Sequence, residues 1–305
     1  MHIGIDLGGT KTEILAFSSA GEVLCRRRVA TVRDYAGCLD QLRSLVAQVE
    51  SEAGRTGTVG IGIPGSLSPL DGRVRNANST WLNGRPLGRD LEASLGRRVR
   101  AENDANCFAL SEATDGAGAG AGSVFGVILG TGVGGGLVVR GRLVTGAQGI
   151  AGEWGHNPLP GPAADDGPRC WCGRRGCVET WLSGSGLARD YLGSAMRSLS
   201  AADIAEAANQ GDPDAVACIE RYVARLGRSL AGVVNLLDPD VIVLGGGLSN
   251  ITDLARRAAE ALLPHVFSDR PQVSVRRHAH GDSSGVRGAA WLGAQTRGNP
   301  EDPAA

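Results

Sequence analysis

The chain has little net charge, a single lysine and no long apolar run. Its formal net charge is −1, so it lacks the basic field that attracts nucleic acid. No segment is apolar over the length that a bilayer requires, and the N-terminus enters a strand-like pattern with no signal peptide before it. These absences predict a cytoplasmic protein without nucleic-acid or membrane partners. Nearly all basic residues are arginine, which we interpret as composition bias, and the one lysine, Lys11, lies in a glycine-rich segment.

Disulfide bonds are also not expected, because seven cysteines are an odd number in a long chain. Four cysteines are isolated and are predicted to be small buried apolar residues: Cys25, Cys38, Cys107 and Cys218. The other three are Cys170, Cys172 and Cys177 in "CWCGRRGC", which lacks the C-x-x-C spacing of a redox pair. Three thiolates and one imidazole complete a tetrahedral zinc site. His156, fourteen residues before Cys170, is the natural fourth ligand.

Glycine, in contrast, is abundant, with 47 residues in a chain of 305. This length fits two domains or one large α/β unit. Residues 3–24 and 125–144 both read as strand, glycine turn, strand, polar turn and strand. Two copies of one hairpin pattern predict a duplicated α/β lobe.

The remaining periodicity predicts helices and further strands. Asp212 and Pro213 provide a cap and a first-turn proline for an amphipathic helix that continues to residue 237. The other expected helices span 35–53, 105–115, 252–263 and 284–296, and the expected strands span 58–63, 97–101 and 240–247.

Three glycine-rich loops that follow apolar strands are candidates for phosphate binding: 6–12, 129–136 and 244–249. Glycine lets backbone N–H groups approach phosphate oxygens closely, and Thr10, Thr12 and Thr131 offer hydroxyl groups. No Walker-type loop is present. The spacing of Gly60, Gly62 and Gly65 matches the dinucleotide fingerprint, but no helix pattern opens there, which disfavours a nicotinamide oxidoreductase. The loops predict a nucleotide held between two lobes.

The segments "DLGGTK", "LGTGVGGG" and "VIVLGGGLSN", in this order, resemble the ROK family over residues 1–296. The resemblance implies an α/β, actin-like and hexokinase-like ATPase fold, with two RNase H-like lobes and a cleft between them. The expected smaller lobe comprises residues 1–117 plus 285–305, and the larger lobe comprises 118–284 with the zinc-binding loop. The resemblance also implies a homodimer.

The resemblance implies ATP and Mg²⁺ as cofactors. In the family, the first two loops clamp the ATP phosphates, the third lies against adenosine, and an aspartate such as Asp6 helps to place Mg²⁺. The implied nucleotide-binding residues of this chain are Gly8, Gly9, Thr10, Lys11, Thr131, Gly132, Gly134, Gly245, Gly246 and Gly247.

In "NDANCFALSEA", the resemblance implies that Asp104 is the catalytic base, and the alternative is that Asp104 only caps a helix. The implied sugar-binding residues are Asn78, Asn103, Glu153, His156 and Glu179. The family's zinc motif matches His156, Cys170, Cys172 and Cys177. A site with four protein ligands is closed, so the expected zinc is structural and ties together the sugar-binding loops.

The implied reaction is transfer of the ATP γ-phosphate to the 6-hydroxyl of a hexose. The segments 76–86 and 152–160 resemble the fructokinase branch, so D-fructose is the expected substrate, with mannose second. N-acetylglucosamine kinase and glucokinase are the alternatives within the family, and Trp154 replaces the phenylalanine usual in the first of these. A sugar-sensing regulator without catalysis is the alternative of another class. The repressor branch is not expected, because the first loop begins at residue 6 and leaves no room for a DNA-binding helix pair.

Overall fold

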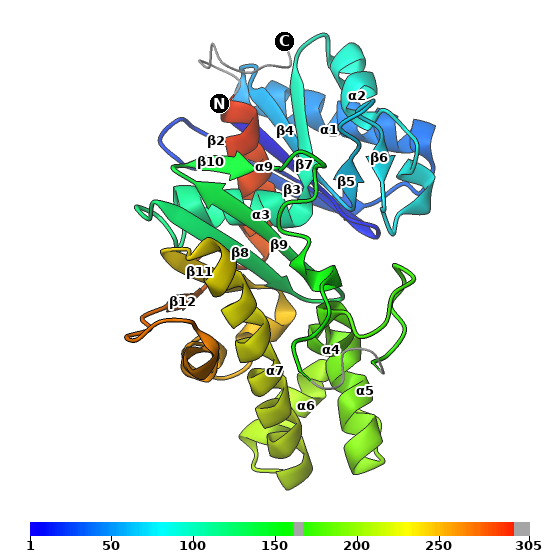
Figure 1. Ribbon diagram of the computed structural model, residues 1–305. Coiled ribbons are helices and arrows are strands. Elements are labelled where there is room, and N and C mark those ends of the chain that lie inside the picture. Colours follow the sequence, from blue (N-terminus) through cyan, green and yellow to red (C-terminus); the bar gives the residue numbers. More distant parts are fainter. Residues whose placement is uncertain (162–166, 296–305) are drawn as a thin grey trace.

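The computed structural model describes residues 1–161 and 167–295 of the chain. Two five-stranded sheets form its framework (Figure 1). The first has the order β3 (Val23–Ala30), β2 (Lys11–Phe17), β1 (His2–Leu7), β4 (Thr58–Ile63) and β7 (Val99–Asn103). The second has the order β10 (Arg142–Val144), β9 (Val133–Val139), β8 (Ser123–Leu129), β11 (Val241–Gly245) and β12 (Ser274–Arg277).

The two sheets share one pairing pattern. In each sheet the hairpin strands pair antiparallel, and the first hairpin strand then pairs parallel with the next strand, as β1 does with β4 and β8 does with β11. The duplicated α/β lobe predicted from the glycine hairpins is therefore confirmed. Because parallel strands end at the same edge of a sheet, the loops after them gather there.

The helices fill the connections between strands. They are α1 (Tyr35–Ala53), α2 (Leu87–Leu95), α3 (Asp104–Thr114), α4 (Val178–Leu182), α5 (Gly184–Ala195), α6 (Ala201–Asn209), α7 (Pro213–Leu237), α8 (Leu254–Leu262) and α9 (Ser284–Ala294). A short hairpin of β5 (Ser66–Leu67) and β6 (Val74–Arg75) follows β4. The 3₁₀ turns are η1 (Thr80–Leu82), η2 (Trp154–His156), η3 (Gly247–Asn250), η4 (Leu263–His265) and η5 (Gly281–Ser283).

Most predicted elements are present, with shifts at their ends. Helix α1 and strand β4 have the predicted bounds, and α7 begins at Pro213 after the side chain of Asp212 accepts the Ala215 N–H at 2.9 Å. Strand β7 lies two residues later than the predicted 97–101. The predicted helix 284–296 ends at Ala294, and residue 296 lies outside the described residues.

Helices α3 and α9 lie in contact between the two sheets (Figure 1). Glycine makes this packing possible, because a Cβ at Gly4 of β1 would lie only 2.0 Å from the Val286 carbonyl oxygen of α9. A Cβ at Gly288 of α9 would lie 1.6 Å from the Cys107 carbonyl oxygen of α3. Any larger residue would force the backbones apart. The two helices therefore join the sheets through direct backbone contact.

Glu112 of α3 reinforces this junction. It is fully buried, and its carboxylate accepts the Ala117 N–H at 2.9 Å, the Ala279 N–H at 3.0 Å and the Ser284 hydroxyl at 2.7 Å. These donors come from the segment after α3 and from the approach to α9. A buried carboxylate is retained at low cost when donors occupy its oxygens. Glu112 thus fixes the point where the chain passes between the sheets.

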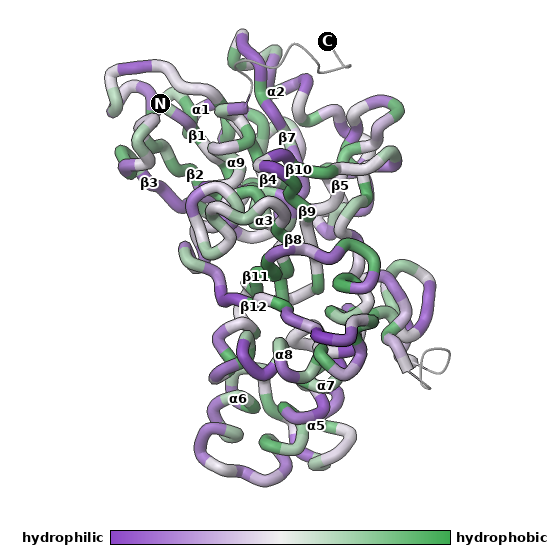
Figure 2. The backbone as a smooth tube through the Cα atoms, turned by 60° about the vertical axis from the view of Figure 1, so that its left-hand side comes forward, coloured by the Kyte–Doolittle hydropathy of each residue, from purple (hydrophilic) through white to green (hydrophobic). Residues whose placement is uncertain are grey.

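Separate apolar cores support the two sheets. One core packs around β1, β4 and α1, and the other around β8, β11 and α7. In Figure 2, hydrophobic segments on β8 and β11 mark the second core. The isolated cysteines are buried as predicted: Cys25, Cys38, Cys107 and Cys218. Among the described residues, no helix has both the length and the apolar character required to cross a membrane.

Candidate active site

The first catalytic candidate lies where β7 passes into α3. The Asn103 side-chain oxygen accepts the N–H groups of Ala105 at 2.9 Å and Asn106 at 3.3 Å, so Asn103 is the N-cap of α3. Asp104 is the first residue of the helix, and its carboxylate also accepts the Ala105 N–H, at 2.8 Å. The alternative that Asp104 is merely the N-cap is therefore wrong. The β7–α3 junction thus places the Asp104 carboxylate at the edge of the sheet where sites of α/β proteins form.

Four acidic side chains are linked pairwise by their charges: Asp104 acts on Asp6, Glu153 acts on Asp104, and Glu179 acts on Glu153. Burial, followed by the charges of Asp104 and Glu13, raises the pKa of Asp6 to about 7. Desolvation by the surrounding protein raises the pKa of Asp104, and the negative charge of Glu153 raises it further. The hydrogen bond from the Ala105 N–H acts in the opposite direction and lowers this pKa. Burial raises the pKa of Glu153, with a further contribution from Glu179. Such a concentration of negative charge suits a divalent cation and a proton acceptor.

The first glycine loop, between β1 and β2, is a tight turn. The Gly8 N–H donates to the Lys11 carbonyl at 3.0 Å, so Gly8 closes the turn, and the Gly8 carbonyl accepts the Thr31 hydroxyl at 2.8 Å. Thr10 and Lys11 are exposed at its tip. The prediction that Thr12 offers a hydroxyl to phosphate is wrong, because Thr12 is buried and bonds to Thr31 at 2.9 Å.

The exposed Asn78 lies beside this first loop. Its neighbour Ser79 has its hydroxyl oxygen only 3.2 Å from where a Cβ at Gly9 would lie. Asn103 is more constrained, because its amide nitrogen donates to the Gly65 carbonyl at 2.7 Å in addition to the capping contacts. The structure therefore brings Asn78 next to the expected phosphate loop and gives the Asn103 side chain a structural role.

The second and third glycine loops lie against each other. A Cβ at Gly246, whose φ is +80°, would lie 2.4 Å from the Leu129 carbonyl oxygen. A Cβ at Gly245 would lie 2.3 Å from the Phe108 ring of α3. Thr131 is exposed in the second loop, and Gly247 starts the 3₁₀ turn η3.

Gly134, expected to contact nucleotide, lies within β9 rather than in the second loop itself. Its carbonyl accepts the Trp154 indole N–H at 2.9 Å. A Cβ at Gly134 would lie 2.9 Å from the Ala105 Cβ, so this glycine lets the start of α3 approach β9. Gly134 thus helps to hold α3, and with it Asp104, against the second sheet.

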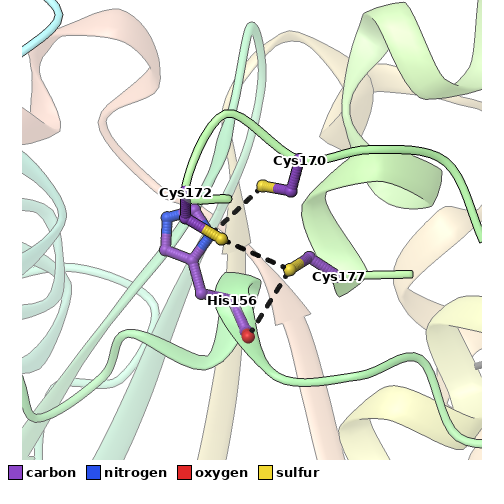
Figure 3. Close-up of side chains that lie close together, drawn as sticks. All are labelled: His156, Cys170, Cys172 and Cys177. Atoms are coloured by element: carbon purple, nitrogen blue, oxygen red, sulfur yellow. Dashed lines mark hydrogen bonds between the residues drawn. The ribbon is translucent and has the colours of Figure 1, made fainter. Parts of the chain in front are cut away.

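His156, Cys170, Cys172 and Cys177 converge at one point (Figure 3). Their ligating atoms all lie within 4.8 Å of one another. The Cys170 sulfur lies 3.6 Å from His156 Nδ1, and the sulfurs of Cys172 and Cys177 are also 3.6 Å apart. With Zn–S bonds of about 2.3 Å, two sulfurs of a tetrahedral site lie roughly 3.8 Å apart. The donor set and spacing therefore fit zinc, as expected from the sequence.

The backbone builds this cluster from a small hairpin. The Cys170 N–H donates to the Arg174 carbonyl at 2.8 Å, and the Val178 N–H donates to the Asn157 carbonyl at 2.8 Å. Gly173 and Gly176 have φ values of +90° and +67°, in the left-handed region that favours glycine. The "CGRRGC" segment thus turns sharply enough to face its thiols toward His156.

Two side chains near the sugar candidates were not predicted. The Trp171 indole N–H donates to Glu179 Oε1 at 2.6 Å. Arg75 of β6 donates to the Gln148 carbonyl, across 73 positions of sequence, and its charge lowers the pKa of Glu153. The sequence signal that could have singled out Trp171 is its position as an aromatic residue between two cysteine ligands, Cys170 and Cys172. No local pattern indicates the Arg75 contact, because it depends on how β6 meets the loop before Glu153.

Comparisons with known proteins agree with this fold. The model of the ROK family matches residues 2–296. N-acetyl-D-glucosamine kinase of Shigella boydii serotype 4 (strain Sb227) is 44% identical over 299 residues, which are 96% of this chain and 99% of that protein. A ROK hexokinase structure from Thermus thermophilus is similar with a TM-score of 0.85 at 33% identity, covering 95% of this chain and 97% of that one. A ROK family glucokinase from Streptomyces griseus, solved with glucose and AMPPNP, has a TM-score of 0.79 at 31% identity, covering 96% of this chain and 99% of that one.

Two matched α/β lobes with this carboxylate and loop arrangement define an ATP-dependent sugar kinase of the hexokinase-like fold. The chain belongs to the ROK family.

Proposed function

We propose that the protein phosphorylates N-acetyl-D-glucosamine with ATP. The observation that carries this choice of sugar is the 44% identity, over nearly the whole of both chains, with N-acetyl-D-glucosamine kinases. The expectation of D-fructose finds no support among these relatives. They favour N-acetylglucosamine, which the sequence analysis gave as an alternative within the family. Glucose is the second candidate, because the Streptomyces griseus glucokinase has a TM-score of 0.79.

In the proposed reaction, the 6-hydroxyl oxygen of the sugar forms a bond to the γ-phosphorus, and the bond from that phosphorus to the ADP oxygen breaks. Asp104 accepts the hydroxyl proton. Its raised pKa makes it a better proton acceptor than an ordinary aspartate. The attack needs little else than positioning and charge stabilisation.

The glycine loops would hold the nucleotide. We assign the phosphates to the first two loops and adenosine to the third, with the residues expected from the sequence. Asp6 would hold Mg²⁺, which neutralises phosphate charge during transfer. The raised pKa of Asp6, which arises from burial and two neighbouring acidic side chains, supports this assignment, because a cation there would offset their repulsion.

The sugar would lie among Asn78, Glu153, His156 and Glu179, with Asn103 holding the start of α3. Zinc bound by the Cys₃His cluster would fix the position of His156, which is one of its ligands, and of Glu179, which follows the ligand Cys177 by two residues. We also propose the expected lobe division, with residues 1–117 and 285–305 in one lobe and 118–284 in the other. The packing of α9 on β1 and β4 supports this division, although 296–305 lie outside the described residues.

A coupled assay of ADP release with N-acetylglucosamine, glucose, mannose and fructose tests the proposal. We expect kcat/KM to be at least about tenfold higher for N-acetylglucosamine than for the other sugars, which corresponds to about 1.4 kcal/mol of transition-state binding. A higher kcat/KM for fructose than for N-acetylglucosamine would instead support D-fructose, the substrate expected from the sequence. Sugar binding without ADP release would instead identify a sugar-sensing regulator.

A further inference from the structure

Trp171 is an exposed indole in the middle of the zinc-binding hairpin. It is 67% exposed, although it lies between Cys170 and Cys172, two members of the Cys₃His cluster. Its ring meets the His156 ring edge-on, with centroids 4.9 Å apart. Core packing does not account for a large apolar surface left open next to a ligand site.

The hydrogen bond of Trp171 indicates what the side chain does. Its indole N–H, which can only donate, points to Glu179 Oε1 at 2.6 Å. The other oxygen of the same carboxylate, Oε2, accepts the backbone N–H of Val133 at 3.0 Å. A single carboxylate therefore connects the zinc-binding hairpin to the start of β9, which leaves the second glycine loop.

The fit at this contact is tight. A Cβ at Gly132 would lie 2.7 Å from Glu179 Oε2, so the second loop touches the carboxylate with backbone alone. The loop is tied on its other side as well, because the Gly130 carbonyl accepts the Gly184 N–H of α5 at 2.8 Å. A rotation of the Glu179 side chain would therefore disturb the loop that we assign to phosphate.

We propose that Trp171 is a positioning residue that holds Glu179 against the second glycine loop, so that sugar binding and nucleotide binding are coupled through this one carboxylate. The coupling to substrates rests on the proposed sugar kinase function. The mechanical link between the zinc-binding hairpin and the second glycine loop does not depend on that function. Hydrogen bonds from an N–H to an ionised carboxylate are stronger than neutral ones, and the loss of one such bond changes an equilibrium by about 10-fold or more.

The test uses the full-length protein with Trp171→Phe, which keeps an aromatic ring but loses the N–H. Trp291→Phe is the matched control, because that indole N–H has no hydrogen-bond partner among the described residues and lies on α9. We expect Trp171→Phe to raise KM for the sugar about 10-fold with a smaller change in kcat. We also expect the sugar to tighten binding of a non-hydrolysable ATP analogue in the parent and to do so much less in the variant. The control should match the parent in both measurements.

Two further measurements distinguish a link through Glu179 from a role of Trp171 in holding the metal. Amide hydrogen exchange at Val133, measured without any sugar, should be about 10-fold faster in Trp171→Phe than in the parent, so the link is tested even if the parent phosphorylates none of the sugars. Zinc content by elemental analysis should be equal in the two proteins. Unchanged exchange at Val133 would overturn the proposal. Loss of zinc from the variant would also overturn it, because Trp171 would then support the metal loop rather than Glu179.

Discussion

The replacement Asp104→Asn tests the proposed base directly. The structure predicts that the variant folds normally, because Asn103 remains the N-cap of α3 and an asparagine oxygen at 104 can still accept the Ala105 N–H, which lies 2.8 Å from the carboxylate. Capping contacts of this kind are worth about 1 kcal/mol each, so the free energy of unfolding should change by less than that.

The rate should change much more. A positioned general base contributes about 10²- to 10⁴-fold, so kcat should fall by that factor, equivalent to about 3 to 5 kcal/mol of barrier. Sugar affinity should stay within about threefold, because the assigned sugar contacts lie on other segments. In the parent, the raised pKa of Asp104 moves the acidic limb of the kcat/KM profile above the range of an ordinary aspartate, since the base must be deprotonated to act.

The assay is ADP release at saturating sugar and ATP, with sugar affinity measured separately by calorimetry. Asp214→Asn, in the first turn of α7, is the control for the same chemical change at another helix start. A variant at 104 with kcat within threefold of the parent would refute the base assignment. A variant that no longer binds sugar would show that Asp104 holds substrate instead.

Other changes test the metal, the loops and the helix junction. Cys172→Ser should lower bound zinc below one per chain and raise KM for the sugar before it lowers thermal stability, and a zinc-free but fully active preparation would contradict the assigned role. Gly132→Ala should raise KM for both substrates about 10-fold or more, because the added methyl would lie 2.7 Å from Glu179 Oε2, and unchanged constants would argue against that contact. Glu112→Ala should lower the free energy of unfolding by about 2 to 5 kcal/mol in urea titrations, because two backbone N–H groups lose their acceptor in a buried site. Mg²⁺ should raise Tm more at pH 8 than at pH 6. The folded pKa of Asp6 is raised from 3.8 to about 7, so stability falls as the pH rises between these values and the full cost is present above them. At pH 6 Mg²⁺ must displace the proton that the folded state holds on Asp6, whereas at pH 8 the carboxylate is already ionised and a cation can relieve its cost. An equal Mg²⁺ effect at both pH values would place the cation elsewhere.

The particular sugar was the weakest part of the sequence-based prediction. The segments 76–86 and 152–160 favoured D-fructose, whereas the relatives over the full length favour N-acetylglucosamine. Selectivity of this kind depends on a few contacts to one hydroxyl or amide, and a short motif does not fix where those contacts point.

The sequence alone determined the repeated strand–loop–strand hairpins, the cap at Asp212 and the four zinc-ligand candidates. These features depend on local spacing, on the special backbone freedom of glycine, and on ligand chemistry, all of which a linear pattern carries. Only the tertiary structure decided that Thr12 pairs with Thr31, 19 positions away in sequence, in the interior. It also decided that Glu179 spans from Trp171 to Val133, 46 positions away in sequence. Such contacts arise where segments distant in the chain are packed together, and no local pattern specifies which distant donor a side chain will meet.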